Sequence, residues 1–188
     1  MTGLGQRCYP CFNEETAQRM GVAFDNAPLQ PIELSGSDGV VHRFEIRSML
    51  CPTGHELIAE EVPSREDRGG YRFAILGDFE ADAWQLFQRL YVKMQRELNE
   101  RHIEYSEYGW RLTDRDRVIG RIDSDPDPDA EDGLPLLVVD GKALKWNDVG
   151  RMLMQYEGFT LHLQVEDSIE VVGGPLLESH DGDDDEKR

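Results

Sequence analysis

The stretch DFEADAWQLFQRLYVKMQRELNERHI, residues 78–103, carries the strongest structural signal in the sequence. Its large apolar residues recur at the three- and four-residue spacing of one helix face, and polar residues occupy the other face. Asp78 precedes the run and is expected to cap the helix. We predict one long amphipathic helix lying on a sheet. Its apolar face consists of Trp84, Phe87, Leu90, Tyr91, Met94 and Leu98.

The residues before this helix predict an antiparallel meander. Apolar, β-branched and aromatic residues gather in short runs that are separated by polar, glycine-rich turns. A short helix is expected near the start of the chain, with Asn13 as its cap and Gly21 at its end. The predicted strands cover 32–34, 40–50, 56–62 and 71–77.

The residues after the long helix predict further strands and a second, shorter helix. Residues 109–122 resemble a hairpin, in which Trp110 and Leu112 face Val118 and Ile122. An Asp-Gly turn divides residues 134–144 into a strand and its return. The other elements expected here are a helix over 147–158, an alternating strand over 159–165 and a final edge strand beginning at Ser168.

These elements indicate an α+β fold, with antiparallel sheets packed on the long helix and on the shorter one. The predicted organisation has an N-terminal C-x-x-C segment with a short helix, an α+β domain, an acidic mobile loop over 123–133 and an acidic tail. The sequence leaves open whether the two halves of the domain share one core. The boundaries are 1–22 for the N-terminal segment, 23–173 for the domain with sub-halves 23–104 and 105–173, and 174–188 for the disordered tail.

The chain of 188 residues has a net charge of −18, and two segments, 123–132 and 178–188, hold 12 of its 38 acidic residues. A negative field of this size repels nucleic acid and anionic membranes, and it suits solubility, tolerance of high salt or a basic partner. The sequence contains no run of 18 apolar residues, so we expect no membrane span, and no secretion signal is visible. We expect a cytoplasmic protein whose three cysteines are reduced.

The motif RCYPC places Cys8 and Cys11 at C-x-x-C spacing, and CPTGH supplies Cys51 and His55. Structural Zn²⁺ takes four sulfur or nitrogen ligands in a tetrahedron, so these four residues are the candidate zinc site. The alternative is that Cys8 and Cys51 are small core residues and His55 lies in a surface loop. A redox pair is less favoured, because residues 1–7 are too short and polar for the strand that precedes a thioredoxin-like motif.

Four stretches of the sequence resemble a family of uncharacterised bacterial proteins, a domain of unknown function. They are CYPCFNEETAQRMGV, FQRLYVKMQRELNERHI, LPLLVVDGKAL and WNDVGRMLMQYEG. The resemblance covers about residues 8–166, and its most specific part is Trp146–Gly158. It implies that the pair matching Cys8 and Cys11 can join an earlier C-x-x-C in a ribbon-like zinc knuckle. No earlier pair precedes Cys8 here.

The sequence is consistent with three alternative functions. Familiar nucleophile, metalloprotease and phosphate-loop motifs are missing, which favours a non-enzymatic interaction or regulatory module with a structural zinc. A metal-dependent hydrolase would use carboxylates such as Asp78, Glu80 or Asp82 with a histidine. An acidic inhibitor or nucleic-acid mimic would occupy a basic protein surface.

Overall fold

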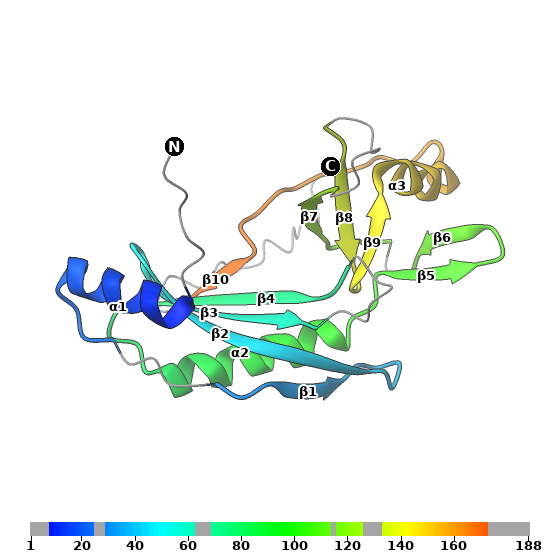
Figure 1. Cartoon of the computed structure of the whole chain (residues 1–188). Coiled ribbons are helices and arrows are strands. Elements are labelled where there is room, and N and C mark those ends of the chain that lie inside the picture. The colour runs from blue at the N-terminus through cyan, green and yellow to red at the C-terminus, as the bar shows by residue number, and fades with distance from the viewer. Residues whose placement is uncertain (1–7, 25–28, 63–68, 114–115, 126–132, 173–188) are drawn as a thin grey trace, which may run out of the picture.

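The computed structural model describes residues 8–24, 29–62, 69–113, 116–125 and 133–172. Within these ranges the chain forms an α+β structure with one larger sheet and two smaller ones (Figure 1). The helices are α1 (Tyr9–Met20), α2 (Ala83–Leu98), α3 (Trp146–Leu153) and the 3₁₀ turn η1 (Met154–Tyr156). The strands are β1 (Ile32–Ser35), β2 (Val41–Cys51), β3 (Gly54–Glu61), β4 (Arg72–Gly77), β5 (Ile103–Ser106), β6 (Gly109–Leu112), β7 (Arg121–Ser124), β8 (Pro135–Val139), β9 (Lys142–Lys145) and β10 (Ile169–Val171).

The larger sheet has the strand order β1-β2-β3-β4-β10. Strands β1 to β4 pair antiparallel, as the meander predicts, and β10 joins β4 in parallel, with Ile169 opposite Ala74. The sheet is therefore mixed, and the expectation of purely antiparallel sheets is wrong at this edge. The difference arises because the last strand returns from the second half of the chain, which no local pattern records.

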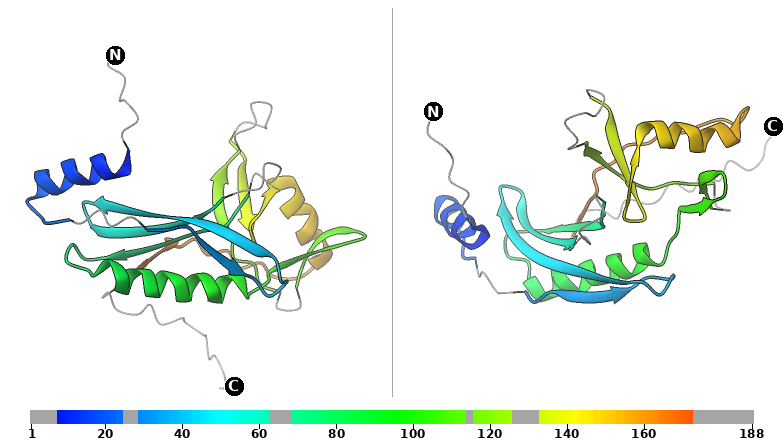
Figure 2. Two further views of the ribbon diagram at one scale, coloured as in Figure 1. Left: turned by 60° about the horizontal axis from the view of Figure 1, so that its bottom comes forward. Right: turned by 45° about the vertical axis from the view of Figure 1, so that its right-hand side comes forward.

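Helix α2 lies along one face of the larger sheet in both views of Figure 2. Alternate residues of the strands turn toward it, as a strand's two-residue period requires. The strand side of this core includes Phe44, Leu57, Phe73 and Ile75, and the helix side includes Leu86, Leu90, Met94 and Leu98. This apolar layer is the main core of the first half.

Helix α2 is shorter than the predicted 78–103 and begins five residues later than expected. Its cap is Asp82, whose Oδ1 accepts a hydrogen bond of 2.9 Å from the Gln85 N–H, and not Asp78. The buried stripe includes Leu86, which the prediction omitted, and excludes Trp84, which is exposed. Trp84 instead stacks on Phe87, with the ring centroids 5.5 Å apart.

The second half has its own apolar cluster, formed by α3 and the two smaller sheets. Its buried members are Ile103, Leu112, Val139, Leu144, Val149 and Met152. The Asp-Gly turn lies where the sequence predicts it, and Asp140 and Gly141 both take the positive φ of a tight hairpin turn, 48° and 73°.

The hairpin predicted over 109–122 does not form. Strand β6 pairs with β5, so that Trp110 lies opposite Tyr105, and Ile122 in β7 pairs with Leu137 in β8. The turn between β5 and β6 uses Gly109 at a φ of 103°, which favours glycine. The prediction missed it because residues 103–106 are too short and polar to signal a strand.

The two halves meet where the start of β4 touches the β8–β9 turn. The Gly70 N–H donates to the Gly141 carbonyl at 2.8 Å, and a Cβ on Gly69 would collide with that same carbonyl. The Asp140 carboxylate accepts from the backbone N–H groups of His102 and Ile103 at 2.8 and 3.0 Å. One aspartate side chain thus ties the segment after α2 to the second half.

Two predicted features, the mobile loop and the tail, lie largely outside the described residues, which omit 126–132 and 173–188. None of the helices in the described ranges is both long and apolar enough to cross a membrane.

Candidate functional site

Helix α1 positions the C-x-x-C pair. Cys8 is the residue before the helix, its backbone is extended, and its carbonyl accepts the first helical hydrogen bond, from Phe12 N–H at 3.0 Å. Pro10 lies in the first turn, where its missing N–H costs nothing. Gly21 ends the helix with a left-handed φ of 69°, as the sequence predicts. The helix starts four residues earlier than predicted, so Asn13 is not its cap.

Asn13 holds α1 against the larger sheet. It is buried, its Nδ2 donates to the Ser48 carbonyl at 2.9 Å, and its Oδ1 accepts from Leu50 N–H at 2.9 Å. Strand β1 pairs with β2 only over Val41–Phe44, which leaves the later part of that edge open. The carboxamide of Asn13 therefore occupies the place of a neighbouring strand's peptide group.

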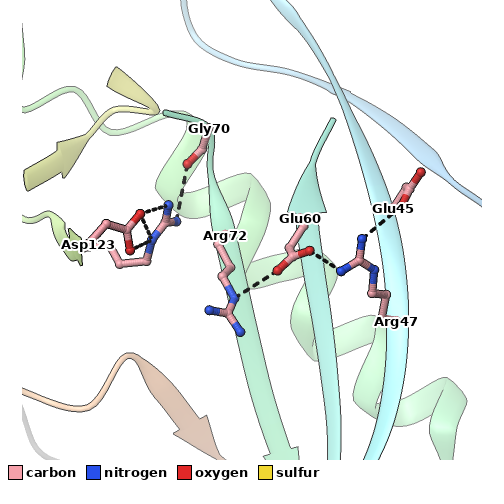
Figure 3. Close-up of polar contacts among 7 residues, drawn as sticks. Glu45, Arg47, Glu60, Gly70, Arg72 and Asp123 are labelled. Atoms are coloured by element: carbon pink, nitrogen blue, oxygen red, sulfur yellow. Dashed lines mark hydrogen bonds and ion pairs between the residues drawn. The ribbon is translucent and has the colours of Figure 1, made fainter. Parts of the chain in front are cut away.

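Tyr9, between the two cysteines, lies beside Arg47 on the face of the larger sheet that is turned away from α2. The Arg47 guanidinium is 5.4 Å from the centre of the Tyr9 ring. Figure 3 shows the charged row to which Arg47 belongs. Arg47 pairs with Glu60 at 2.5 Å and with Glu45 at 3.3 Å, and Glu60 also contacts Arg72 at 3.4 Å. The first turn of α1 thus has a neighbour on β2, Arg47, which is paired with Glu60 of β3.

The two thiols of the pair lie together at the surface. Their sulfur atoms are 2.8 Å apart, so one thiol donates a hydrogen bond to the other, and both residues are exposed. The hydrogen bond with the Cys11 thiol, followed by that with the Cys11 backbone, lowers the pKa of Cys8 below its ordinary value of 9.0. Cys8 therefore carries more thiolate, the form that attacks electrophiles and binds metals.

The other two predicted zinc ligands lie in the β2–β3 hairpin. Cys51 contacts the Gly54 carbonyl at 3.2 Å and the Thr53 hydroxyl at 3.3 Å. His55 is buried, its Nε2 lies 2.8 Å from the Ser48 hydroxyl, and its ring meets Phe24 edge-on. Burial lowers the pKa of His55, which favours the neutral ring.

Cys8 thus lies beside Cys11, and Cys51 lies in the same hairpin as His55. Within the described ranges no group of three or more His, Cys, Asp and Glu side chains is placed to hold a metal ion. The four-residue zinc site stays a prediction from the sequence.

The carboxylates considered for a hydrolase serve the turn that leads into α2. Asp78 Oδ1 accepts from the Glu80 N–H at 3.1 Å, and Asp82 is the helix cap already described. His55 contacts the backbone of Ala81, which lies in the same turn. These groups have local structural roles that account for their positions.

A second feature concerns residues 159–166, which we call the open segment. It runs as a stretched connection from η1 to β10 (Figure 1). Strand formation was predicted over 159–165, but the segment pairs with no described strand. Phe159 N–H bonds back to the Tyr156 carbonyl, and no backbone hydrogen bond joins residues 160–166 to the rest of the described chain.

The open segment exposes an unusual amount of apolar surface. Its apolar side chains alternate along the chain and are between 65% and 78% exposed. The side chains of Gln164 and Glu166 contact each other, as neighbours two apart do on one face of a strand. The four apolar residues are Phe159, Leu161, Leu163 and Val165.

Two parts of the chain match models of known families. A family model for a domain of unknown function (DUF7686) matches residues 25–99, and a second one (DUF7713) matches residues 102–170. Two parts of the chain are therefore similar to domains of unknown function, which agrees with the resemblance to an uncharacterised family. Neither a curated protein nor a solved structure matches it. Neither match includes Cys8 or Cys11.

Sequence reasoning identified the thiol pair from its spacing but missed what surrounds it. Asn13 and Arg47 hold the pair's helix, and neither stands in a recognisable motif. The alternation of residues 159–165 was visible, whereas the lack of a partner strand was not, because a strand's pairing depends on distant residues.

Proposed function

We propose that the protein is a non-enzymatic interaction module that binds an extended segment of a partner protein along residues 159–166. The observation that carries this proposal is the open segment itself, with four exposed apolar side chains on a backbone that forms no strand hydrogen bonds with the described residues. A partner strand would satisfy those backbone groups and bury the apolar face, which is the chemistry of β-strand addition.

The charge around the open segment favours a basic partner. Glu157, Glu166 and Asp167 flank the apolar residues, and the sequence contains no Lys or Arg between Arg151 and Lys187. The fitting partner is thus an extended segment with alternating apolar side chains and Lys or Arg at its ends. A second copy of the chain would place acidic flanks of both copies close together, which costs free energy.

The experiment uses the full chain and two labelled synthetic peptides of alternating Val and Thr, one with Lys at both ends and one with Glu. Fluorescence anisotropy measures binding, and hydrogen exchange reports the amides of residues 160–166. The Lys peptide is expected to bind more tightly, to lose affinity with added salt, and to slow exchange across the segment.

The matched variants are Leu161→Asp with Leu163→Asp, and Val92→Asp on α2, where Val92 is 63% exposed and Leu161 is 65% exposed. The first pair is expected to abolish peptide binding, and the second to leave it unchanged. Equal binding by all variants, or unchanged exchange in residues 160–166 with either peptide, would refute the proposal. So would amides already protected in the free chain through a dimer seen by light scattering.

A further inference from the structure

We propose that Cys8 and Cys11 form a reversible dithiol–disulfide pair, in which Cys8 attacks a low-molecular-weight disulfide and Cys11 completes the exchange. The inference is independent of the open segment and concerns the first turn of α1. It returns to the redox interpretation that the sequence disfavoured, because the structure supplies geometry that the missing strand does not affect.

The first argument is the closeness of the two sulfur atoms. They lie 2.8 Å apart on one turn of helix, and a disulfide bond is about 2.05 Å long. Closing the bond needs a small side-chain movement and no rearrangement of α1. Asn13, one turn further on, keeps the helix on β2 in both redox states, since its hydrogen bonds to the Ser48 carbonyl and the Leu50 N–H end on β2.

The second argument is that the two cysteines differ in their roles. Cys8 lies before the helix, where the N–H groups of the first turn point outward and favour negative charge. A thiolate on Cys8 is stabilised by this end of the helix, and the Cys11 sulfur is in contact with the Cys8 sulfur. Cys8 is thus the attacking thiolate and Cys11 the resolving thiol, and both are exposed to a small reactant.

The third argument is the separate environment of the remaining cysteine. The Cys51 sulfur contacts Thr53 and Gly54 within its own turn, and the described residues bring no third ligand to Cys8 and Cys11. A pair to which the described residues bring no third His, Cys, Asp or Glu suits exchange chemistry better than a closed structural metal site, which takes four ligands.

The chemical step conserves atoms and electrons. The Cys8 thiolate attacks one sulfur of a disulfide R–S–S–R, which forms a mixed disulfide and releases RS⁻. Cys11 loses its proton to solvent and attacks the Cys8 sulfur, which forms the Cys8–Cys11 disulfide and releases the second RS⁻. The two protein thiols are oxidised by two electrons, and the small disulfide is reduced to two thiols.

The test begins with the purified full chain, whose metal content is measured by mass spectrometry. The protein is then equilibrated with mixtures of reduced and oxidised glutathione, and remaining thiols are trapped with a maleimide. Intact-mass measurement is expected to show one disulfide that forms and disappears with the glutathione ratio, with peptide mapping placing it at Cys8–Cys11.

Three single variants separate the roles. Cys11→Ser is expected to accumulate a stable glutathione adduct on Cys8, because the resolving thiol is gone. Cys8→Ser is expected to lose both disulfide and adduct, and Cys51→Ser to behave like the parent. Circular dichroism checks that each variant is folded.

Four results would overturn the proposal. They are an absent adduct in folded Cys11→Ser, an adduct on Cys11 in Cys8→Ser at the parent rate, a disulfide that includes Cys51, and one bound zinc per chain that blocks the exchange until a chelator removes it. The last result would instead support the predicted zinc site.

Discussion

At the scale of single residues, Asn13 joins the first helix to the sheet through two hydrogen bonds to one strand edge. Both partners, the Ser48 carbonyl and the Leu50 N–H, belong to β2, and the side chain is buried. A buried backbone donor or acceptor that loses its partner carries the full cost of its desolvation.

Asn13→Ala is therefore expected to destabilise the docking of α1 by about 1–3 kcal/mol. Hydrogen exchange of the α1 amides measures the effect, with the amides of α2 as an internal reference. Glu15→Ala is the control on the same helix, since Glu15 forms an exposed pair with Arg19 and is expected to matter by less than about 0.5 kcal/mol. Equal exchange in both variants would contradict the role of Asn13.

Glu56 is a second informative residue, because it is a buried carboxyl on β3. Burial raises its pKa above the ordinary 4.5, Arg72 opposes the rise, and Asp167 adds to it. A carboxyl whose pKa is higher in the folded state than in the unfolded state destabilises the fold when ionised. The stability present below the unfolded-state pKa is then lost as the pH rises through the folded-state pKa.

Glu56→Gln is thus expected to raise the free energy of unfolding at pH 7 relative to the parent, and this gain is expected to disappear at about pH 4 and below. Urea unfolding at a series of pH values measures it. Glu107→Gln, in the exposed β5–β6 turn, controls for the loss of one negative charge. A gain that is the same at pH 4 and pH 7 would show that ionisation of Glu56 is not its cause.

At the scale of elements, two glycines with open surroundings have different backbone conformations. Gly109 takes a φ of 103° in the β5–β6 turn, whereas Gly150 lies inside α3. A Cβ at either position would meet nothing within 4 Å, so conformation alone sets the effect.

Gly109→Ala is expected to destabilise the protein by about 1–3 kcal/mol, and Gly150→Ala to stabilise it by about 0.5–1 kcal/mol. Thermal and urea unfolding of the two variants provide the measurement. Since the substitution is the same, each variant is the control for the other. The same sign of change in both would contradict the backbone assignment.

Local patterns predicted most elements, and they failed where pairing or capping depended on distant residues. The strands β1 to β4 and the β8–β9 hairpin were visible in apolar runs and turn residues. The start of α1 was not, because Asn13 resembles a cap in sequence but is needed at the edge of β2. The spacing of Cys8 and Cys11 showed a paired site, whereas the closeness of their sulfur atoms and the roles of the two thiols required the structure.

At the scale of the whole molecule, Lys93 connects α2 with β4 and with Ser168, the residue just before β10. It is buried, and its Nζ donates to the Ala74 carbonyl at 3.1 Å and to the Ser168 carbonyl at 2.9 Å. Just beyond β10, the Val172 N–H donates to the Leu76 carbonyl at 2.7 Å. One helix residue therefore secures the parallel strand that returns from the second half.

Lys93→Met keeps the length of the side chain and removes both hydrogen bonds, so we expect a loss of about 1–3 kcal/mol in unfolding free energy. Faster hydrogen exchange at β10 and Val172 than at β2 and β3 would show that the loss is local to this edge. Lys145→Met, at an exposed lysine of β9, is the control. Unchanged exchange at β10 would contradict the connecting role of Lys93.

The parallel pairing of β10 with β4 also has a consequence for the evolution of the chain. The first domain match ends at residue 99, yet the fifth strand of its sheet begins at Ile169, within the region that the second match covers. Recombination that exchanged only one half between relatives would join a β4 edge to a β10 that had not evolved beside it. The two matched regions are therefore expected to evolve as one unit, and phylogenetic trees calculated from each region should show the same branching order.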